Sequence, residues 1–256
     1  MINFDFSGKT VLITGGSRGI GEACARVFAN AGANVIITYK SGKAQAEAVL
    51  NSLPEKERHM AVHLDMQQPG MIEEVFTAVS GRENRVDVVV NNAGIFIEHK
   101  ILEVSYDAWQ QAWQDTIAAN LIGVSNLCYV AARHMKEMGG GKIINISSRG
   151  AFRGEPDHPA YGASKAGLNA LSQSLAVALA PYNITVGVIA PGFVETDMAK
   201  EYLAGEEGEK IKKQSPLNRV AQPEEVARAV AAFASGGLEF MTGGIWDVNG
   251  ASYLRS

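Results

Sequence analysis

At 256 residues, the chain is long enough for one large α/β domain or two small ones. Hydrophobic residues make up 46% and charged residues 20%, the balance of a globular protein with a full core, and a net charge of −4 excludes the basic footprint of a nucleic-acid-binding protein. No apolar run approaches the ~20 residues that cross a bilayer, and no signal peptide begins the chain, so we expect a cytoplasmic protein.

Short apolar runs alternate with longer amphipathic segments along the chain. The expected strands cover residues 10–14, 34–39, 59–64, 87–91, 142–147, 184–190 and 245–248. The expected helices cover residues 19–31, 44–53, 71–79, 106–138 and 161–180. Most strands are continuous Val/Ile-rich runs, which is typical of parallel strands buried on both faces. This order predicts one doubly wound α/β domain over residues 1–256, with helices on both faces of the sheet.

The cysteines and histidines indicate neither a disulfide framework nor a metal site. The two cysteines, Cys24 and Cys128, lie in apolar helical stretches and are interpreted as buried, reduced thiols. The five histidines show no metal-ligand spacing with cysteine or carboxylate, so we predict no metal site. The polar segment 195–214 has two interpretations, a solvated pair of surface helices or a mobile lid over a substrate.

A glycine-rich turn follows the first expected strand. It reads Thr-Gly-Gly-Ser-Arg-Gly-Ile-Gly over residues 14–21 and opens the first expected helix. Glycines 15, 19 and 21 let the backbone turn sharply and approach a pyrophosphate, and the helix N-terminus offers N–H groups to it. Many tight turns need glycine, but the strand–turn–helix context favours a dinucleotide site over a purely structural turn.

The end of the second strand bears on cofactor choice. A site for NAD places an acid here to bind the ribose 2′-hydroxyl, whereas this chain has Tyr39 and Lys40. Lys40 and Arg18 are interpreted as partners of a 2′-phosphate, or otherwise as ordinary surface cations. The sequence therefore predicts that NADP(H) is preferred over NAD(H).

Tyr161 and Lys165 are four residues apart on one expected helix. This spacing puts the phenol and the ammonium on one face. A phenol with a pKa of about 10 is a poor acid or base at neutral pH, and a nearby ammonium favours its ionised form. Alone, such a pair is usually a surface coincidence, so its interpretation depends on the motifs around it.

Five ordered motifs make the chain resemble the short-chain dehydrogenase/reductase family over its whole length. They are the Thr14–Gly21 turn, the run Asn-Asn-Ala-Gly at 91–94, Asn120 in the long helix, Ser148 thirteen residues before Tyr161 with Lys165 four after it, and Pro191-Gly192 followed by Val194 and Thr196. The resemblance implies a seven-stranded, mostly parallel Rossmann sheet of order 3-2-1-4-5-6-7, with cofactor and substrate bound by the same domain.

The resemblance also implies four catalytic residues. Tyr161 would exchange a proton with the substrate oxygen, and Ser148 would hydrogen-bond that oxygen. Lys165 would hold the nicotinamide ribose and lower the pKa of the tyrosine, and Asn120 would bind a water that links Lys165 to solvent. Ser147, adjacent to Ser148, is the weaker candidate for the oxygen-binding serine.

The same resemblance implies a set of cofactor contacts. The predicted residues are Gly15, Ser17, Arg18, Gly19, Ile20, Gly21, Tyr39, Lys40, Asp65, Met66, Asn92, Ala93, Gly94, Tyr161, Lys165, Pro191, Gly192, Val194 and Thr196. Three of these assignments have alternatives. Asp65 is either the residue that meets the adenine or a turn residue, Thr196 is either a carboxamide contact or a helix cap, and Asn91 could cap a strand while Asn92 binds.

The substrate is the least determined feature. The chain resembles 3-oxoacyl-carrier-protein reductases most, with dehydrogenases of sugars, polyols or cyclic alcohols as the alternative. Arg149, Phe152, Arg153 and His158 would help to decide. Residues 175–183 carry no basic side chain, so docking of an acyl carrier protein is weakly supported. A catalytically silent NADP(H)-binding regulator is the alternative from another class. Family resemblance implies a homotetramer, and the nearly uncharged helix 168–180 is a candidate for its interface. From the net charge and the lack of a long apolar run, we expect neither nucleic-acid nor membrane binding.

Overall fold

The protein was analysed as a computed structural model, which describes residues 4–83 and 85–255; residues 1–3, 84 and 256 of the predicted domain lie outside this description. One sheet organises the fold. Its strands are β1 (Thr10–Ile13), β2 (Asn34–Tyr39), β3 (Met60–His63), β4 (Val88–Asn91), β5 (Gly141–Ile146), β6 (Ile184–Pro191) and β7 (Ile245–Val248). The order is β3-β2-β1-β4-β5-β6-β7, and every pair is parallel. The predicted order and fold class are confirmed, and the sheet is wholly rather than mostly parallel.

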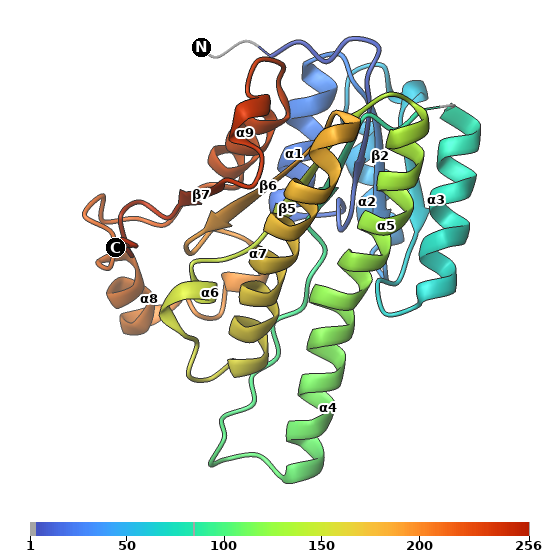
Figure 1. Ribbon diagram of the computed structural model, residues 1–256. Helices are drawn as coiled ribbons and strands as arrows, with labels where there is room; N and C mark the ends of the chain where they lie inside the picture. The colour runs from blue at the N-terminus through green and yellow to red at the C-terminus, as the bar shows by residue number, and fades with distance from the viewer. Residues whose placement is uncertain (1–3, 84, 256) are drawn as a thin grey trace.

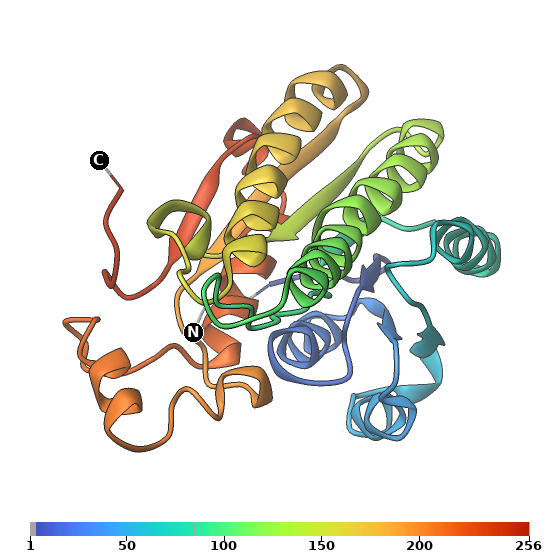
Figure 2. The ribbon, with the colours of Figure 1, turned by 90° about the horizontal axis from the view of Figure 1, so that it is seen from below.

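Helices cover both faces of this sheet (Figures 1 and 2). One face packs against α1 (Gly19–Asn30), α2 (Lys43–Asn51) and α9 (Pro223–Ala234), and the other against α3 (Pro69–Glu83), α5 (Gly123–Glu137) and α7 (Pro159–Leu179). Phe28 and Phe233 are fully buried on the first face, Leu127 and Leu168 on the second. Burial on both faces explains why β4, β5 and β6 have few polar residues.

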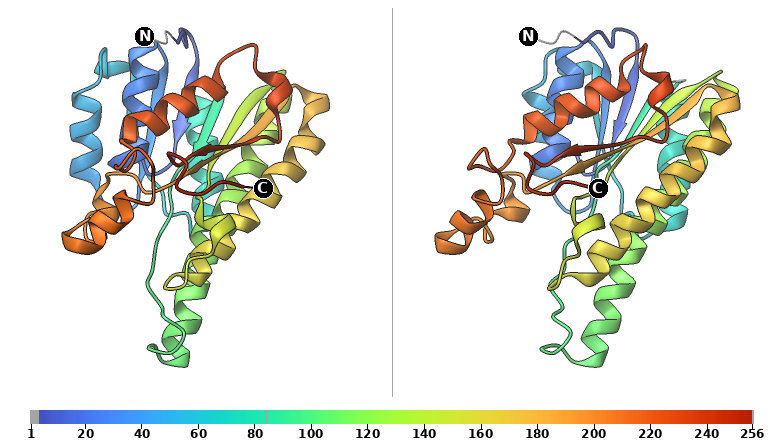
Figure 3. Two further views of the ribbon diagram at one scale, coloured as in Figure 1. Left: turned by 90° about the vertical axis from the view of Figure 1, so that its left-hand side faces the viewer. Right: turned by 60° about the vertical axis from the view of Figure 1, so that its left-hand side comes forward.

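The helix expected over residues 106–138 is interrupted. It consists of α4 (Tyr106–Ile117), a π-helical turn (Ala118–Ile122) and α5. The apolar periodicity continues through the break, so the sequence pattern gave no sign of it, and π turns occur frequently at functional sites. In Figures 1 and 3, α4 and the loop before it extend beyond the lower edge of the sheet.

The C-terminal third contains one helix that the sequence analysis missed. Helix α9 lies beside α1 on the near face in the left view of Figure 3. The polar segment 195–214 forms a short 3₁₀ turn (Asp197–Ala199) and α8 (Gly205–Lys212), and the choice between a lid and a surface helix pair stays open. Over residues 4–83 and 85–255, no helix combines the length and the apolar character needed to cross a membrane.

Candidate active site

A cavity of about 580 Å³ runs along the carboxyl ends of the central strands. Gly15 follows β1, Asn92 follows β4, and Ser148 follows β5, and all three line it. In open parallel sheets, ligands bind at this edge, where the strand order reverses between β1 and β4. The cavity is therefore the candidate site for both cofactor and substrate.

The glycine-rich turn forms one end of this cavity. Gly15 and Gly19 have φ angles of +66° and +57°, which side-chain-bearing residues rarely adopt. Gly21 serves a different purpose, because a Cβ there would lie 2.2 Å from the carbonyl oxygen of Gly15. Helix α1 begins at Gly19 without a side-chain cap, so its first N–H groups are available to an anion. These features fit a pyrophosphate.

Asn92 braces the turn from the neighbouring strand. Its Nδ2 donates to the carbonyl oxygens of Thr14 (3.0 Å) and Gly15 (3.1 Å), and the Thr14 hydroxyl accepts from the N–H groups of Asn92 and Ala93 at 3.0 Å. Asn91 instead turns into the core and donates to Asn145 Oδ1 at 2.8 Å. The two adjacent asparagines thus have different roles, and only Asn92 of the two reaches the cavity.

Lys40 lies beside the predicted adenine residue rather than alone at the surface. Its Nζ is 2.8 Å from Asp65 Oδ2 and donates to Gln67 Oε1 at 2.7 Å. Asp65 Oδ1 also accepts from the N–H of Gln67, so Asp65 is a turn residue as well as a cavity residue. The Lys40 ammonium lowers the pKa of Asp65 against the opposing effect of burial. A 2′-phosphate would compete with Asp65 for Lys40.

Tyr161 and Ser148 meet at the centre of the cavity. Tyr161 stands at the start of α7, where the ring of Phe96 contacts its ring edge-to-face with centroids 4.7 Å apart. Burial, together with the Glu155 carboxylate, raises the pKa of Tyr161 to about 12, and the neighbouring Ser148 hydroxyl lowers it by a smaller amount. The structure therefore favours the protonated phenol. Ser147, in contrast, donates to the carbonyl oxygen of Lys165 at 3.3 Å, which leaves Ser148 as the serine beside Tyr161.

Lys165 is buried one turn further along α7. Its Nζ donates to the carbonyl oxygen of Ile146 at 2.7 Å and lies 5.6 Å from the centre of the Tyr161 ring. Burial lowers the pKa of Lys165 to about 8. The prediction that Lys165 lowers the pKa of Tyr161 is not supported without cofactor, since the group with that effect here is Ser148.

Asn120 holds the π turn against the segment after β4. Its Oδ1 accepts from the Ile95 N–H at 2.8 Å, and its Nδ2 donates to the Ile95 carbonyl oxygen at 2.9 Å and to Ser164 Oγ at 3.3 Å. A Cβ on Gly94 would lie 3.3 Å from Asn120 Oδ1 and 3.7 Å from Lys165 Nζ. The side chain therefore acts as a brace next to Lys165, and the water predicted to bind Asn120 stays a prediction.

The cavity brings together most of the predicted residues. Gly15, Ser17, Arg18, Gly19, Ile20, Tyr39, Lys40, Asp65, Met66, Asn92, Ala93, Gly94, Ser148, Tyr161, Lys165, Pro191, Gly192, Val194 and Thr196 all line it. Gly21 and Asn120 stand behind this lining. The Thr196 side chain makes no cap hydrogen bond to the following 3₁₀ turn, so of its two predicted roles only the cavity position is seen.

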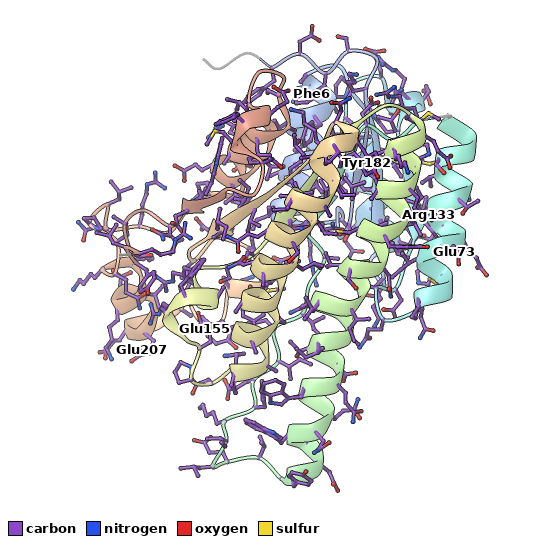
Figure 4. All side chains as sticks on the ribbon, in the orientation of Figure 1. Phe6, Glu73, Arg133, Glu155, Tyr182 and Glu207 are labelled. Carbon is purple, nitrogen blue, oxygen red and sulfur yellow. The ribbon has the colours of Figure 1, made fainter. Side chains whose placement is uncertain are left out.

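Sequence analysis missed several residues at the substrate end. Phe96 stacks on His158 with centroids 3.6 Å apart, and His158 Nε2 lies 3.0 Å from the Tyr202 hydroxyl. Tyr202 belongs to the 195–214 segment, so this segment contributes directly to the cavity wall. Glu155 also lines the cavity, and Figure 4 shows it beside α6 (Gly150–Arg153). Only His158 had been named, because these residues belong to no recognisable motif.

Comparisons with known proteins agree with this geometry. A family model described as enoyl-(acyl carrier protein) reductase matches residues 15–251. The 3-oxoacyl-[acyl-carrier-protein] reductase of Aquifex aeolicus is 38% identical over 251 residues, covering 96% of this chain and 98% of that protein. The protein of the same name from Escherichia coli is 37% identical over 250 residues, covering 98% and 99%. The crystal structure of gox2181 superposes with a TM-score of 0.90 at 30% identity, covering 97% of this chain and 96% of that one.

Proposed function

The chain belongs to the short-chain dehydrogenase/reductase family, and from this we propose that it is an NADP(H)-dependent reductase of 3-oxoacyl thioesters. Oxidoreductase chemistry between a nicotinamide and a carbonyl or alcohol follows from the family membership. The 3-oxoacyl substrate is inferred from the relatives of that name. The observation that carries the proposal is the placement of Ser148, Tyr161 and Lys165 in one cavity with the glycine-rich turn.

The residues at the centre of the cavity suit a carbonyl oxygen. Ser148 and Tyr161 both line the cavity, and the Ser148 hydroxyl is close enough to act on the phenol, so one substrate oxygen can accept from both hydroxyls. Such donors stabilise negative charge as it develops on the oxygen, and Tyr161 then gives up its proton to form the alcohol. The nicotinamide, when bound, would supply the hydride. A protonated phenol at neutral pH is the form that reduction needs.

The rest of the cavity fits the remainder of a dinucleotide. The turn and the uncapped N-terminus of α1 would hold the pyrophosphate, and Asp65 and Met66 would meet the adenine. Lys165 would hold the nicotinamide ribose, and Val194 and Thr196 the carboxamide. A catalytically silent regulator has no need for an intact Ser148–Tyr161–Lys165 set, so the geometry favours the enzyme.

A substrate screen tests the proposal. Purified protein with NADPH would be offered 3-oxobutanoyl thioesters, the matching 2-enoyl thioester, sugars and cyclic ketones, with NADPH absorbance as the measurement. We expect the 3-oxoacyl thioesters to give the highest kcat/KM. Preferred reduction of a sugar or cyclic ketone would support the alternative substrate class, and preferred reduction of the 2-enoyl thioester would contradict the carbonyl assignment.

The preference for NADPH is expected to depend on Lys40. A hydrogen bond to a charged group contributes about 1.5–3 kcal/mol, so Lys40→Ala should reduce the ratio of kcat/KM for NADPH over NADH by roughly 10- to 100-fold. Lys43→Ala is the matched control, because Lys43 is an exposed cation three residues away that pairs with Glu47 outside the cavity. A wild-type preference for NADH would overturn the proposed cofactor choice.

Assembly, carrier docking and location stay predictions. Tyr106 on α4, Tyr129 on α5 and Val177 on α7 are exposed apolar or aromatic side chains, which supports an isologous helical interface and the proposed homotetramer. Residues 175–183 offer no basic side chain to an acidic acyl carrier protein, so the proposal does not depend on a carrier-bound substrate. A cytoplasmic location, without nucleic-acid or membrane partners, accords with the composition.

A further inference from the structure

Glu155 introduces a carboxylate at the substrate end of the cavity. It lies between α6 and the start of α7, six residues before Tyr161, and is half-buried. The carboxylate acts on Tyr161 through space and raises the pKa of its phenol. A negative charge here opposes the formation of a phenolate and of an alkoxide, so it is an unexpected residue beside this pair.

Two glycines lie close to the Glu155 side chain. A Cβ on Gly150 would lie 2.5 Å from Glu155 Oε1 and 2.8 Å from its Cγ. Gly150 has no left-handed φ angle, so space rather than conformation explains the glycine. Gly162 lets α7 approach the same place, since a Cβ there would lie 3.3 Å from the carbonyl oxygen of Gly150. Glycine at these two positions therefore leaves room for the Glu155 side chain beside the start of α7.

Within the described residues, no donor reaches the Glu155 carboxylate and no cation lies within 4.0 Å of it. The two nearest arginines are engaged elsewhere. Arg149 donates to Ser252 Oγ and Gln214 Oε1, both at 2.6 Å, and Arg153 donates to the same Gln214 oxygen at 3.1 Å. Both arginines act on Glu155 only through space, as does Asp157 with the opposite sign, and burial raises the pKa of Glu155. The Glu155 carboxylate lines the cavity with both oxygens free of partners in the described part of the chain, so it can accept a hydrogen bond from a ligand there.

We propose that Glu155 is a specificity-determining residue that accepts a hydrogen bond from an N–H or O–H group of the substrate close to the reacting carbonyl. A donor would satisfy the carboxylate and weaken its effect on Tyr161, whereas an anionic substrate group would be repelled by it. The inference rests on the proposed carbonyl reduction. Two kinds of substrate carry such a donor, namely thioesters whose arm contains an amide and ketones that bear a hydroxyl.

Matched substrate pairs test this proposal. The first pair is the 3-oxobutanoyl thioester of N-acetylcysteamine, whose arm has an amide N–H, and the S-ethyl thioester, which lacks it. The second pair is 4-hydroxybutan-2-one and butan-2-one. A hydrogen bond to a charged group predicts that kcat/KM favours the donor-bearing member of one pair by about 10- to 100-fold in wild type. The pair that shows this ratio identifies the source of the donor.

Two variants separate this role from a structural one. Glu155→Ala should bring the ratio close to one, because the loss of the charge acts on Tyr161 with both substrates but only the donor-bearing one loses a hydrogen bond. Glu155→Gln, which keeps the size and one acceptor oxygen, should retain part of the ratio. Glu73→Gln is the control, because Glu73 is an exposed carboxylate on α3 that does not line the cavity and lies well away from Glu155 in Figure 4. General damage to folding would lower both rates and leave the ratio unchanged.

The outcomes are distinguishable. If wild type reduces both members of each pair equally, or if the ratio survives in both Glu155 variants, the assignment of Glu155 is wrong while the proposed reductase activity stands. If wild type reduces neither thioester, the proposed function fails first, and the ketone pair alone then decides on Glu155.

Discussion

Replacement of Tyr161 by phenylalanine is expected to lower kcat with NADPH and a 3-oxoacyl thioester by about 10²- to 10⁴-fold, the range for a lost proton donor. The phenol hydroxyl is the one group that the substitution removes. The ring contacts with Phe96 and Lys165 remain, so the cavity should keep its shape. The dissociation constant of NADPH, measured by fluorescence titration, should change little.

Tyr129→Phe provides the control for this substitution. Tyr129 is exposed on α5, where its ring lies 5.5 Å from the Arg133 guanidinium, and it does not line the cavity. The control should turn over like wild type. A missing proton donor should lower kcat by more than about tenfold. If Tyr161→Phe retains more than about a tenth of wild-type kcat, another group must donate the proton.

The direction of pH dependence follows from the same residue. With the pKa of Tyr161 raised to about 12, the phenol stays protonated across the neutral range, so reduction has its proton donor there. Oxidation of the alcohol needs the ionised phenol and should gain rate as the pH rises. If the bound cofactor lowers the pKa of Tyr161, the loss of reduction rate and the gain of oxidation rate would both occur at lower pH. The direction of each change would stay the same.

Much of this site could be predicted from the sequence because local rules determine it. The strand ends carry the glycine-rich turn, Asn92 and Ser148, and parallel strands bring their carboxyl ends to one edge. The spacing of Tyr161 and Lys165 follows from the helix repeat. These features need only the chain order and the sheet order, and the sequence contained signals for both.

Helix α9 was missed although its signals were available. Gln222 and Glu225 form a capping box with Pro223 in the first turn, and the buried residues Val226, Ala227, Val230 and Ala231 follow the helical period. These signals are local, so this helix, unlike the π turn, could have been predicted from the sequence.

Other features depend on three-dimensional contacts that no local pattern encodes. The π turn at Ala118–Ile122 does not interrupt the apolar periodicity of the sequence. It is associated with a hydrogen bond between Asn120 and the distant Ile95, which no local pattern predicts. Lys40 pairs with Asp65 across two strands, and Glu155 reaches the cavity through the close approach of α6 and α7. Burial, with a smaller contribution from Glu155, raises the pKa of Tyr161, whereas the helix spacing predicted a lower one.

Replacement of Lys165 by methionine is expected to abolish most turnover and yet to stabilise the fold. The ammonium is buried, and its pKa is lowered from 10.5 to about 8 because burial disfavours its charged form. One pKa unit corresponds to about 1.4 kcal/mol, so removal of the charge should raise the free energy of unfolding near pH 7 by roughly 1–3 kcal/mol. The lower end of this range allows for the cost of leaving the Ile146 carbonyl oxygen without its hydrogen-bond donor.

The pH dependence of stability distinguishes this explanation from a simple gain in packing. Between pH 8 and 10.5, Lys165 keeps its proton in the unfolded chain and releases it in the folded one. The free energy of unfolding of wild type therefore rises with pH over this range, and below pH 8 the full cost of burying the charged lysine applies. Lys165→Met should lack this rise in urea unfolding, while Lys56→Met, at an exposed lysine, should keep it. A methionine variant that is less stable at pH 7 would show that the lysine is favourably solvated in its site. Lys165, which we propose to hold the nicotinamide ribose, would then carry no energetic cost in the free protein.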